Sequence, residues 1–441
     1  MHFRVQIESV RPIAALAFEI DLTRHGLLCI VGKNGAGKTT LAKALMNLGL
    51  ADTFVRTSSE GIFDSSSTIR YMVNEDEYLF TYDSALRSLS SKKLIPTHLK
   101  KLIAVEMPAP HGQRFTFFRT LANADDEIRR AIVLKQYRRP TGIIEFLSNI
   151  YGERRFDNLV EVNFRGGVCC CIIQANQRYI REDYFSSGEY FLINLYRKIL
   201  KKTSLVVIDE IDIALDANAQ AHLANQLRQL CQQHHVTVMF TSHSLALMQT
   251  LDSSELHYLD RTETGEVLTP MSFNAVKSLL FGFKGWDRYI LTEDKVLAQF
   301  LEYIINCYCS PVFFSYQIIH ASGSGQAVGL MNRNIEYQFL GAPAQVISVL
   351  DGDQVRPNMP PRVHCIPLQD VEKALWEEYR QPDFLYSFEG GEKLDPKQLY
   401  KEYRRLRTLS PEEIFAMLCA RHEVGIAQFS QVLRTFLCRP S

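Results

Sequence analysis

One glycine-rich loop constrains the fold of this chain more than any other feature. Residues 32–39 read Gly-Lys-Asn-Gly-Ala-Gly-Lys-Thr and fit the pattern G-x-x-x-x-G-K-[ST]. An apolar run at Leu27–Val31 precedes the loop, and a helical stretch at Thr40–Met46 follows it. A strand, a glycine loop and a helix in this order build a cradle of backbone N–H groups. The sequence therefore predicts a phosphate-binding loop in an α/β fold, with Lys38 on phosphate oxygens and the Thr39 hydroxyl on Mg²⁺.

A second apolar strand ends in paired carboxylates. Leu205–Ile208 is followed directly by Asp209 and Glu210. In an open parallel sheet the carboxyl ends of the strands face the ligand, so we expect both acids beside the phosphate loop. Asp209 is predicted to hold the magnesium shell, and Glu210 is predicted to act as the general base on the attacking water.

The elements around these motifs alternate between strand and helix. Apolar runs at Leu205–Ile208 and Val236–Phe240 flank a helical stretch at Ala219–Gln233, which is typical of a parallel α/β architecture. Between residues 50 and about 160 the pattern is less regular, and lysine-rich helical spacing predicts a helix within Ser84–Val105. Strand patterns resume around Phe156–Tyr179.

Three further motifs complete a set that resembles the ABC-type ATPases. Residues 185–189, Phe-Ser-Ser-Gly-Glu, resemble the signature motif and precede an apolar helix. Residues 214–216 resemble the D-loop, and Thr241-Ser242-His243 at the end of the next strand resembles the switch histidine. The order of the whole set matches over roughly the first 270 residues. The family's Q-loop glutamine is not assigned.

The resemblance implies a composite ATP site. In this family the signature of one subunit closes over the γ-phosphate held by another, so Ser186 and Gly188 would act in trans and His243 would contact the γ-phosphate. ATP and Mg²⁺ are the implied cofactors, Thr39 and Asp209 the implied magnesium ligands, and a homodimer or higher homo-oligomer the implied assembly. The residues expected to contact ATP from the loop are Asn34, Gly35, Ala36, Gly37, Lys38, Thr39 and Thr40.

The chain departs from the transporter members of that family. Its signature reads Ser-Ser-Gly-Glu, a long insertion precedes it, and an α/β pattern follows. These features resemble the SMC-like soluble branch, which includes chromosome-maintenance ATPases and overcoming-lysogenization-defect (OLD) nucleases. No heptad-rich arm is visible, which argues against the chromosome-maintenance type. We expect a cytoplasmic protein with no membrane partner and with free thiols at its ten cysteines, since no apolar run, leader or cysteine spacing suggests otherwise.

The C-terminal part resembles a TOPRIM domain. Glu293 follows a strand at Tyr289–Leu291, and Asp351 and Asp353 follow a strand at Gln345–Leu350. In that family these acids bind divalent metal for phosphodiester chemistry. Asp294 and Leu297 stand where the family usually has glycine and a further acid, and no late lysine is assigned. An active nuclease and a degenerate docking platform both stay open, and the departures favour the platform.

We therefore expect three parts and one of three functions. The parts are an ABC-type P-loop ATPase domain at 1–285 with a helical and β insertion at about 50–160, a TOPRIM-like α/β domain at 286–385, and a helical segment at 386–441. Resemblance to OLD-family and Septu-type antiphage defence ATPases implies an ATPase that senses or regulates a nuclease effector. The alternatives are an ATP-gated, metal-dependent DNA nuclease and a DNA-repair clamp.

A clamp would bind DNA or RNA through basic residues of the insertion. Lysine plus arginine and aspartate plus glutamate both number 49, so no overall positive charge favours nucleic acid. The same residues are also typical of a solvated face. They are Lys92, Lys93, Lys100, Lys101, Arg129 and Arg130.

Overall fold

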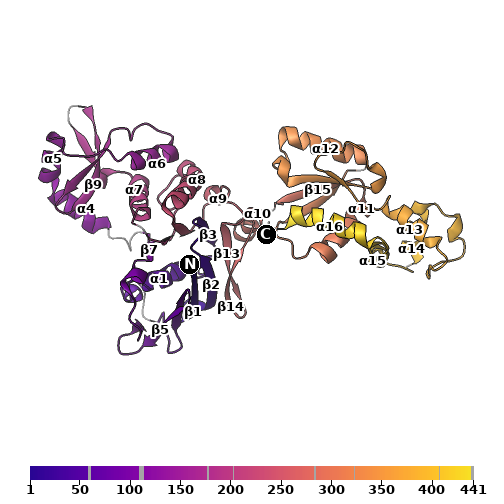
Figure 1. Cartoon of the computed structure of the whole chain (residues 1–441), viewed down its shortest axis with the longest axis horizontal. Helices are drawn as coiled ribbons and strands as arrows, with labels where there is room; N and C mark the ends of the chain where they lie inside the picture. The colour runs from indigo at the N-terminus through magenta and orange to yellow at the C-terminus, as the bar shows by residue number, and fades with distance from the viewer. Residues whose placement is uncertain are drawn as a thin grey trace. The chain divides into compact units, whose positions relative to one another are not determined.

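The computed structural model divides the chain into two units, Met1–Val276 and Lys277–Ser441 (Figure 1). It describes residues 1–57, 61–108, 114–175, 178–201, 203–282, 285–321, 323–406 and 408–438. The division falls inside helix α10 (Phe273–Phe281), whereas the sequence analysis places the boundary near residues 282–285, of which 283 and 284 lie outside the described residues.

The N-terminal unit is built on a six-stranded central sheet in the order β14-β13-β3-β12-β11-β7. The five strands from β13 to β7 are parallel, and β14 is antiparallel to β13. Every residue of β11 and β12 is buried, as expected for parallel strands covered on both faces. The strands are β3 (Leu27–Val31), β7 (Ile103–Glu106), β11 (Leu205–Ile208), β12 (Thr237–Thr241), β13 (Leu256–Thr262) and β14 (Gly265–Pro270), and helices α1 (Lys38–Asn47), α8 (Ala217–His234) and α9 (Leu245–Met248) accompany them.

An antiparallel sheet in the order β2-β1-β4-β5-β6 packs into the same core. Its strands are β1 (His2–Val10), β2 (Ile13–Asp21), β4 (Thr68–Val73), β5 (Asp76–Asp83) and β6 (Ser88–Ser90), and the short helix α2 (Thr53–Thr57) precedes β4. The buried Tyr71 on β4 donates its hydroxyl proton to the Ala44 carbonyl of α1 at 2.5 Å. Residues 68–90 thus extend the sheet begun by β1 and β2, instead of forming part of an insertion.

The helical spacing over Ser84–Val105 does not produce one long helix. That segment contains β6, the four-residue helix α3 (Thr97–Lys100) and β7, which is an edge strand of the central sheet. The lysines that suggested helical spacing are exposed around these short elements. Strands of three and four residues are too short to produce a clear period in the sequence.

The remaining insertion forms a lobe of its own within the N-terminal unit (Figure 1). A sheet in the order β10-β9-β8 packs against α4 and α5, and Cys169, Cys170 and Cys171 lie buried in β9 as free thiols. Arg197 of the helix that follows this sheet, α7, forms ion pairs with Glu182 at 2.8 Å and with Glu161 of β8 at 3.4 Å. The elements are α4 (Arg114–Asn123), α5 (Asp125–Val133), α6 (Thr141–Tyr151), β8 (Leu159–Phe164), β9 (Gly167–Ile173), β10 (Tyr179–Arg181), η2 (Glu182–Tyr184) and α7 (Ser187–Ile199).

The C-terminal unit holds a four-stranded parallel sheet in the order β16-β15-β17-β18. Its strands are β15 (Arg288–Thr292), β16 (Tyr316–His320), β17 (Val346–Leu350) and β18 (Val363–Cys365). The helical elements are α11 (Lys295–Ile304), the π-helical turn η3 (Ile305–Cys309), α12 (Ser324–Tyr337), η4 (Pro343–Gln345), η5 (Gly352–Gln354), α13 (Val371–Tyr379), η6 (Gly391–Lys393), α14 (Pro396–Leu406), α15 (Pro411–Arg421) and α16 (Glu423–Leu437).

The last three helices belong to the core of this unit. Leu399, Ile414 and Leu433 pack in one buried cluster with Ile290 of β15. Helices α14, α15 and α16 therefore share one hydrophobic core with the sheet of this unit, although the sequence analysis treats residues 386–441 as a separate segment. Ser410 caps α15 in a capping box, with Pro411 at the first helical position.

Candidate nucleotide-binding site

Three of the predicted motifs lie at one edge of the central sheet. β3, β12 and β11 are neighbouring parallel strands, and each of them leads into one motif. The glycine loop follows β3, Thr241-Ser242-His243 closes β12, and Asp209 and Glu210 follow β11. Because parallel strands share their carboxyl edge, segments far apart in sequence meet there.

The loop is shaped by glycines that no larger residue could replace without strain. Gly35 and Gly37 have φ values of 79° and 101°, in the left-handed region. A Cβ atom on Gly37 would lie 2.6 Å from Cγ1 of Ile13, and one on Gly32 would lie 2.7 Å from the Leu259 carbonyl oxygen. The loop thus presents its backbone N–H groups at the N-terminus of α1.

Lys38 curls back over this loop. Its ammonium donates hydrogen bonds to the carbonyl oxygens of Gly32 at 2.8 Å and Lys33 at 3.2 Å. Burial lowers the pKa of Lys38, while the charges of Asp209 and Glu210 oppose that shift. The cation is therefore held inside the curve of the loop, where a phosphate group would meet it.

Thr241 orients both carboxylate residues that follow β11. Its hydroxyl donates to Oδ1 of Asp209 at 2.7 Å and accepts the backbone N–H of Glu210 at 2.8 Å. The other carboxylate oxygen of Asp209, Oδ2, is buried and has no hydrogen-bond partner. A free buried carboxylate oxygen at this edge of the sheet fits Mg²⁺, which usually takes few protein ligands and completes its shell with phosphates and water.

Glu210 has a strained backbone. Its φ of 55° lies in the left-handed region, which costs a residue with a side chain about 1–2 kcal/mol. Non-glycine residues held in this conformation cluster at functional sites, where the surrounding structure enforces them. Here the Thr241 hydrogen bond to the Glu210 N–H supplies that enforcement, and the half-buried side chain stays at the sheet edge.

His243 closes the third side of the site. Its backbone N–H donates to Oδ1 of Asp212 at 3.3 Å. Burial lowers the pKa of His243, and the Lys38 charge lowers it further, against the opposing carboxylates of Asp212 and Glu210. The imidazole is consequently neutral at pH 7 and can donate one hydrogen bond to a phosphate oxygen.

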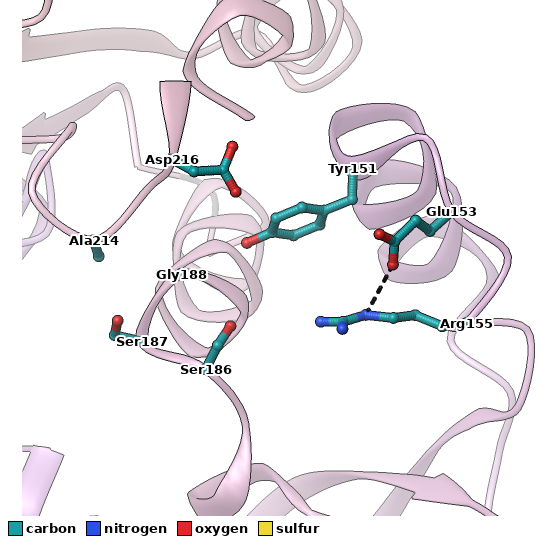
Figure 2. Close-up of a pocket in the computed structure, with 8 residues that line it drawn as sticks. All are labelled: Tyr151, Glu153, Arg155, Ser186, Ser187, Gly188, Ala214 and Asp216. Carbon is teal, nitrogen blue, oxygen red and sulfur yellow. Dashed lines mark ion pairs between the residues drawn. The ribbon is translucent and has the colours of Figure 1, made fainter. Parts of the chain in front are cut away.

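Ser186 and Gly188 do not lie with the three motifs at the sheet edge. They line a pocket of about 320 Å³ at the start of α7 (Figure 2). We call it the signature pocket; none of the glycine-loop residues lines it. Ser186 caps α7 in a capping box with Glu189, whose Oε2 accepts the Ser186 N–H at 2.9 Å. The lining residues are Tyr151, Glu153, Arg155, Ser186, Ser187, Gly188, Ala214 and Asp216.

The structure adds three residues that the sequence analysis missed. Tyr151, Glu153 and Arg155 come from the end of α6 and the segment after it. A Cβ on Gly188 would lie 2.7 Å from the Tyr151 hydroxyl and 2.8 Å from the Ala214 carbonyl, so the signature and the D-loop pack tightly together. No local motif marks these three residues, because only the fold of the insertion brings them to the signature.

The predicted metal residues of the C-terminal unit are only partly brought together. Oε1 of Glu293 accepts the backbone N–H of Asp351 at 3.0 Å. Asp353 instead pairs with Lys373 at 2.8 Å, and Lys373 also pairs with Asp370 at 2.9 Å. Within the described ranges, no three His, Cys, Asp or Glu side chains are arranged to hold a metal ion. Metal binding by Glu293, Asp351 and Asp353 therefore stays a prediction, and in this structure Asp353 is paired with Lys373.

Crowding of acids around Asp351 gives a pH-dependent prediction. Burial and then the Glu293 charge raise the pKa of Asp351 to about 8, whereas the hydrogen bond from Lys373 lowers the pKa of Asp353. A carboxyl with a raised pKa in the fold stabilises it only while protonated, so stability falls as the pH rises towards 8.

We expect Asp351→Asn to raise the melting temperature of the full chain by several degrees at about pH 9, with the gain shrinking towards pH 5. Differential scanning calorimetry across this pH range measures the effect. Asp353→Asn is the matched control and should give no gain, because its carboxylate is already stabilised by Lys373. Equal behaviour of the two variants would contradict the assignment.

The basic residues of the clamp hypothesis do not form one element. Four of them lie around β6, α3 and β7, whereas Arg129 and Arg130 lie on α5. Lys93 pairs with Asp76 at 3.5 Å and Arg129 with Asp125 at 2.8 Å. Part of their charge is therefore balanced locally, which favours the solvated face.

Comparison with known proteins relates the chain to ATP-binding proteins. A family model described as an AAA domain matches residues 4–84. The chain is 30% identical over 113 residues to the oligopeptide transport ATP-binding protein OppF of Mycoplasma genitalium, covering 25% of this chain and 13% of that protein. It is 24% identical over 224 residues to the ABC transporter ATP-binding protein YejF of Escherichia coli, covering 51% and 34%.

A third relative covers a larger share of both chains. A protein of Brucella ovis, named as a peptide import ATP-binding protein, is 23% identical over 268 residues, covering 59% of this chain and 67% of its own length. Among solved structures, the SMC head domain from Thermotoga maritima aligns at a TM-score of 0.36 and 15% identity, covering 61% of this chain and 98% of that chain. The Smc head from Pyrococcus furiosus bound to the C-terminal domain of ScpA aligns at 0.40 and 13%, covering 63% and 98%.

The relatives differ from this chain in extent. The chain spans only 13% and 8% of the length of the first two curated relatives it matches. None of the helices in the described part of the chain has both the length and the apolarity needed to cross a membrane. Taken with the site at the sheet edge, these matches show that the N-terminal part of the chain is similar to the ATP-binding proteins of ABC transporters.

Proposed function

We propose that this protein binds and hydrolyses ATP between two copies of the chain. The observation that carries the proposal is the meeting of the glycine loop, Asp209, Glu210 and His243 at one sheet edge, with a free buried oxygen on Asp209. Ser186 lines the signature pocket, and no residue of the glycine loop lines it, so in this proposal a second copy of the chain brings its nucleotide to Ser186.

Each residue has a part in this proposal. The glycine loop and Lys38 bind the phosphates, and Asp209 with Thr39 would hold Mg²⁺, which neutralises phosphate charge when bound. Glu210 accepts a proton from the attacking water, and its fixed backbone places the carboxylate at the sheet edge. His243, neutral at pH 7, donates a hydrogen bond to the terminal phosphate.

We further propose that nucleotide state regulates a nuclease effector, in the manner of OLD-family and Septu-type antiphage defence ATPases. Support comes from the motif resemblance and from the C-terminal unit, where Lys373 pairs with Asp353, one of the three predicted metal ligands. A unit of this kind suits docking of a partner protein that carries the nuclease.

The contrasting function, a nuclease within this chain, has one favourable observation. Glu293 and Asp351 do lie together, joined by a hydrogen bond of 3.0 Å. Incubating the purified protein with plasmid, ATP and either Mg²⁺ or Mn²⁺ separates the two functions. Our proposal expects ATP hydrolysis without cutting; cutting that Asp351→Ala abolishes would assign the nuclease to this chain instead.

A further inference from the structure

The signature pocket is lined by charged side chains of both signs. Two of the residues lining it, Glu153 and Asp216, are acidic, and both are exposed. Arg155 is the single cation among the described residues that line the pocket. Without Arg155 the pocket would repel a triphosphate, because like charges at short range oppose binding.

Arg155 lies beside two aromatic rings. Its guanidinium lies 5.0 Å from the ring centre of the buried Phe156 and 5.9 Å from that of Tyr151, within the distance of a cation–π interaction with each ring. Figure 2 shows the Arg155 and Tyr151 side chains pointing into the pocket towards Ser186. Half of the Arg155 side chain stays exposed, which leaves donors for a ligand.

Arg155 is paired with two carboxylates in this structure. It pairs with Glu153 at 3.4 Å and with Oε1 of Glu189. Glu189 uses its other oxygen to accept the Ser186 N–H at the start of α7. The Glu189 carboxylate thus contacts both the Arg155 guanidinium and the N-terminus of α7. Guanidinium groups and helix N-termini are both groups that bind phosphate oxygens.

We infer that Arg155 binds the terminal phosphate of a nucleoside triphosphate carried by the glycine loop of a second copy of this chain. This inference rests on the proposed two-copy ATP site and adds to it a phosphate-binding residue outside the signature motif. Arg155 exchanges its Glu189 pairing for the phosphate when the copies close. A nucleoside diphosphate, which lacks that phosphate, does not draw Arg155 away.

The test uses Arg155→Ala in the full chain, with Arg154→Ala as the matched control. Arg154 is the exposed neighbour and does not line the pocket. Arg155→Ala should leave ATP binding by the separate chain unchanged, weaken ATP-driven dimerisation by about 10-fold or more, and slow hydrolysis by roughly 100-fold. Isothermal titration, sedimentation and phosphate release measure the three quantities, and Arg154→Ala should match wild type in each.

A double variant separates phosphate binding from a structural role. If Arg155 served only to neutralise the buried Glu189, then Arg155→Ala combined with Glu189→Gln would restore activity, because glutamine keeps the capping box without the charge. We expect the double variant to stay as impaired as Arg155→Ala. Restoration, or an Arg155→Ala protein that behaves like Arg154→Ala, would overturn the inference. A wild-type protein that neither dimerises nor hydrolyses ATP would instead overturn the proposed function.

Discussion

Glu210→Gln should slow ATP hydrolysis by at least about 100-fold while ATP binding stays intact. Glutamine has the shape of glutamate but cannot take the proton from the attacking water. Thr241 would still hold the backbone at residue 210, since that hydrogen bond uses the main-chain N–H. Unhydrolysed ATP should then keep two copies closed around it.

Single-turnover hydrolysis and retention of labelled ATP after gel filtration measure this effect. ATP binding serves as the internal control, because a misfolded variant would lose it together with hydrolysis. A hydrolysis rate equal to that of wild type would remove Glu210 from the role of general base.

Lys38→Ala should abolish nucleotide binding, with a loss of affinity of about 100-fold or more. The ammonium sits inside the glycine loop on the carbonyls of Gly32 and Lys33, whereas the Lys33 side chain is exposed. Its removal leaves the phosphates facing backbone groups alone.

Lys33→Ala is the matched control for this change. Lys33 belongs to the same loop but is exposed, so its loss should change affinity by no more than a few-fold. Titration with ATP and Mg²⁺ measures both variants. Tight binding by Lys38→Ala, or equal losses for the two variants, would contradict the assigned role.

The sheet edge with its three motifs was predictable from sequence because each motif directly follows an apolar strand. Leu27–Val31 and Leu205–Ile208 have the bounds that the apolar runs predict, and the strand before His243 differs by one residue at each end. Local pattern sufficed there, since parallel strands bring their carboxyl ends together whatever lies between them.

The signature pocket was only half predictable. Ser186 and Gly188 stand in a recognisable motif, but Tyr151 and Arg155 reach them through the fold of the insertion lobe. The same limit explains β7, a four-residue edge strand whose place is set by pairing with β11. In the C-terminal unit, the pairing of Asp353 with Lys373 depends on how α13 packs, which no spacing of acids could reveal.

The most direct test of the account is a crosslink between two copies. Asn34 and Ser187 are both exposed, one in the glycine loop and one in the signature pocket. One tagged copy carries Asn34→Cys and a differently tagged copy carries Ser187→Cys. Both copies also carry Glu210→Gln, and Cys307→Ser to remove the exposed thiol. The two proteins are mixed and treated with a bifunctional maleimide.

The account predicts a crosslinked pair of differently tagged chains with ATP and Mg²⁺, and little of it with ADP. ATP binding without any nucleotide-dependent crosslink between the chains would contradict the composite site.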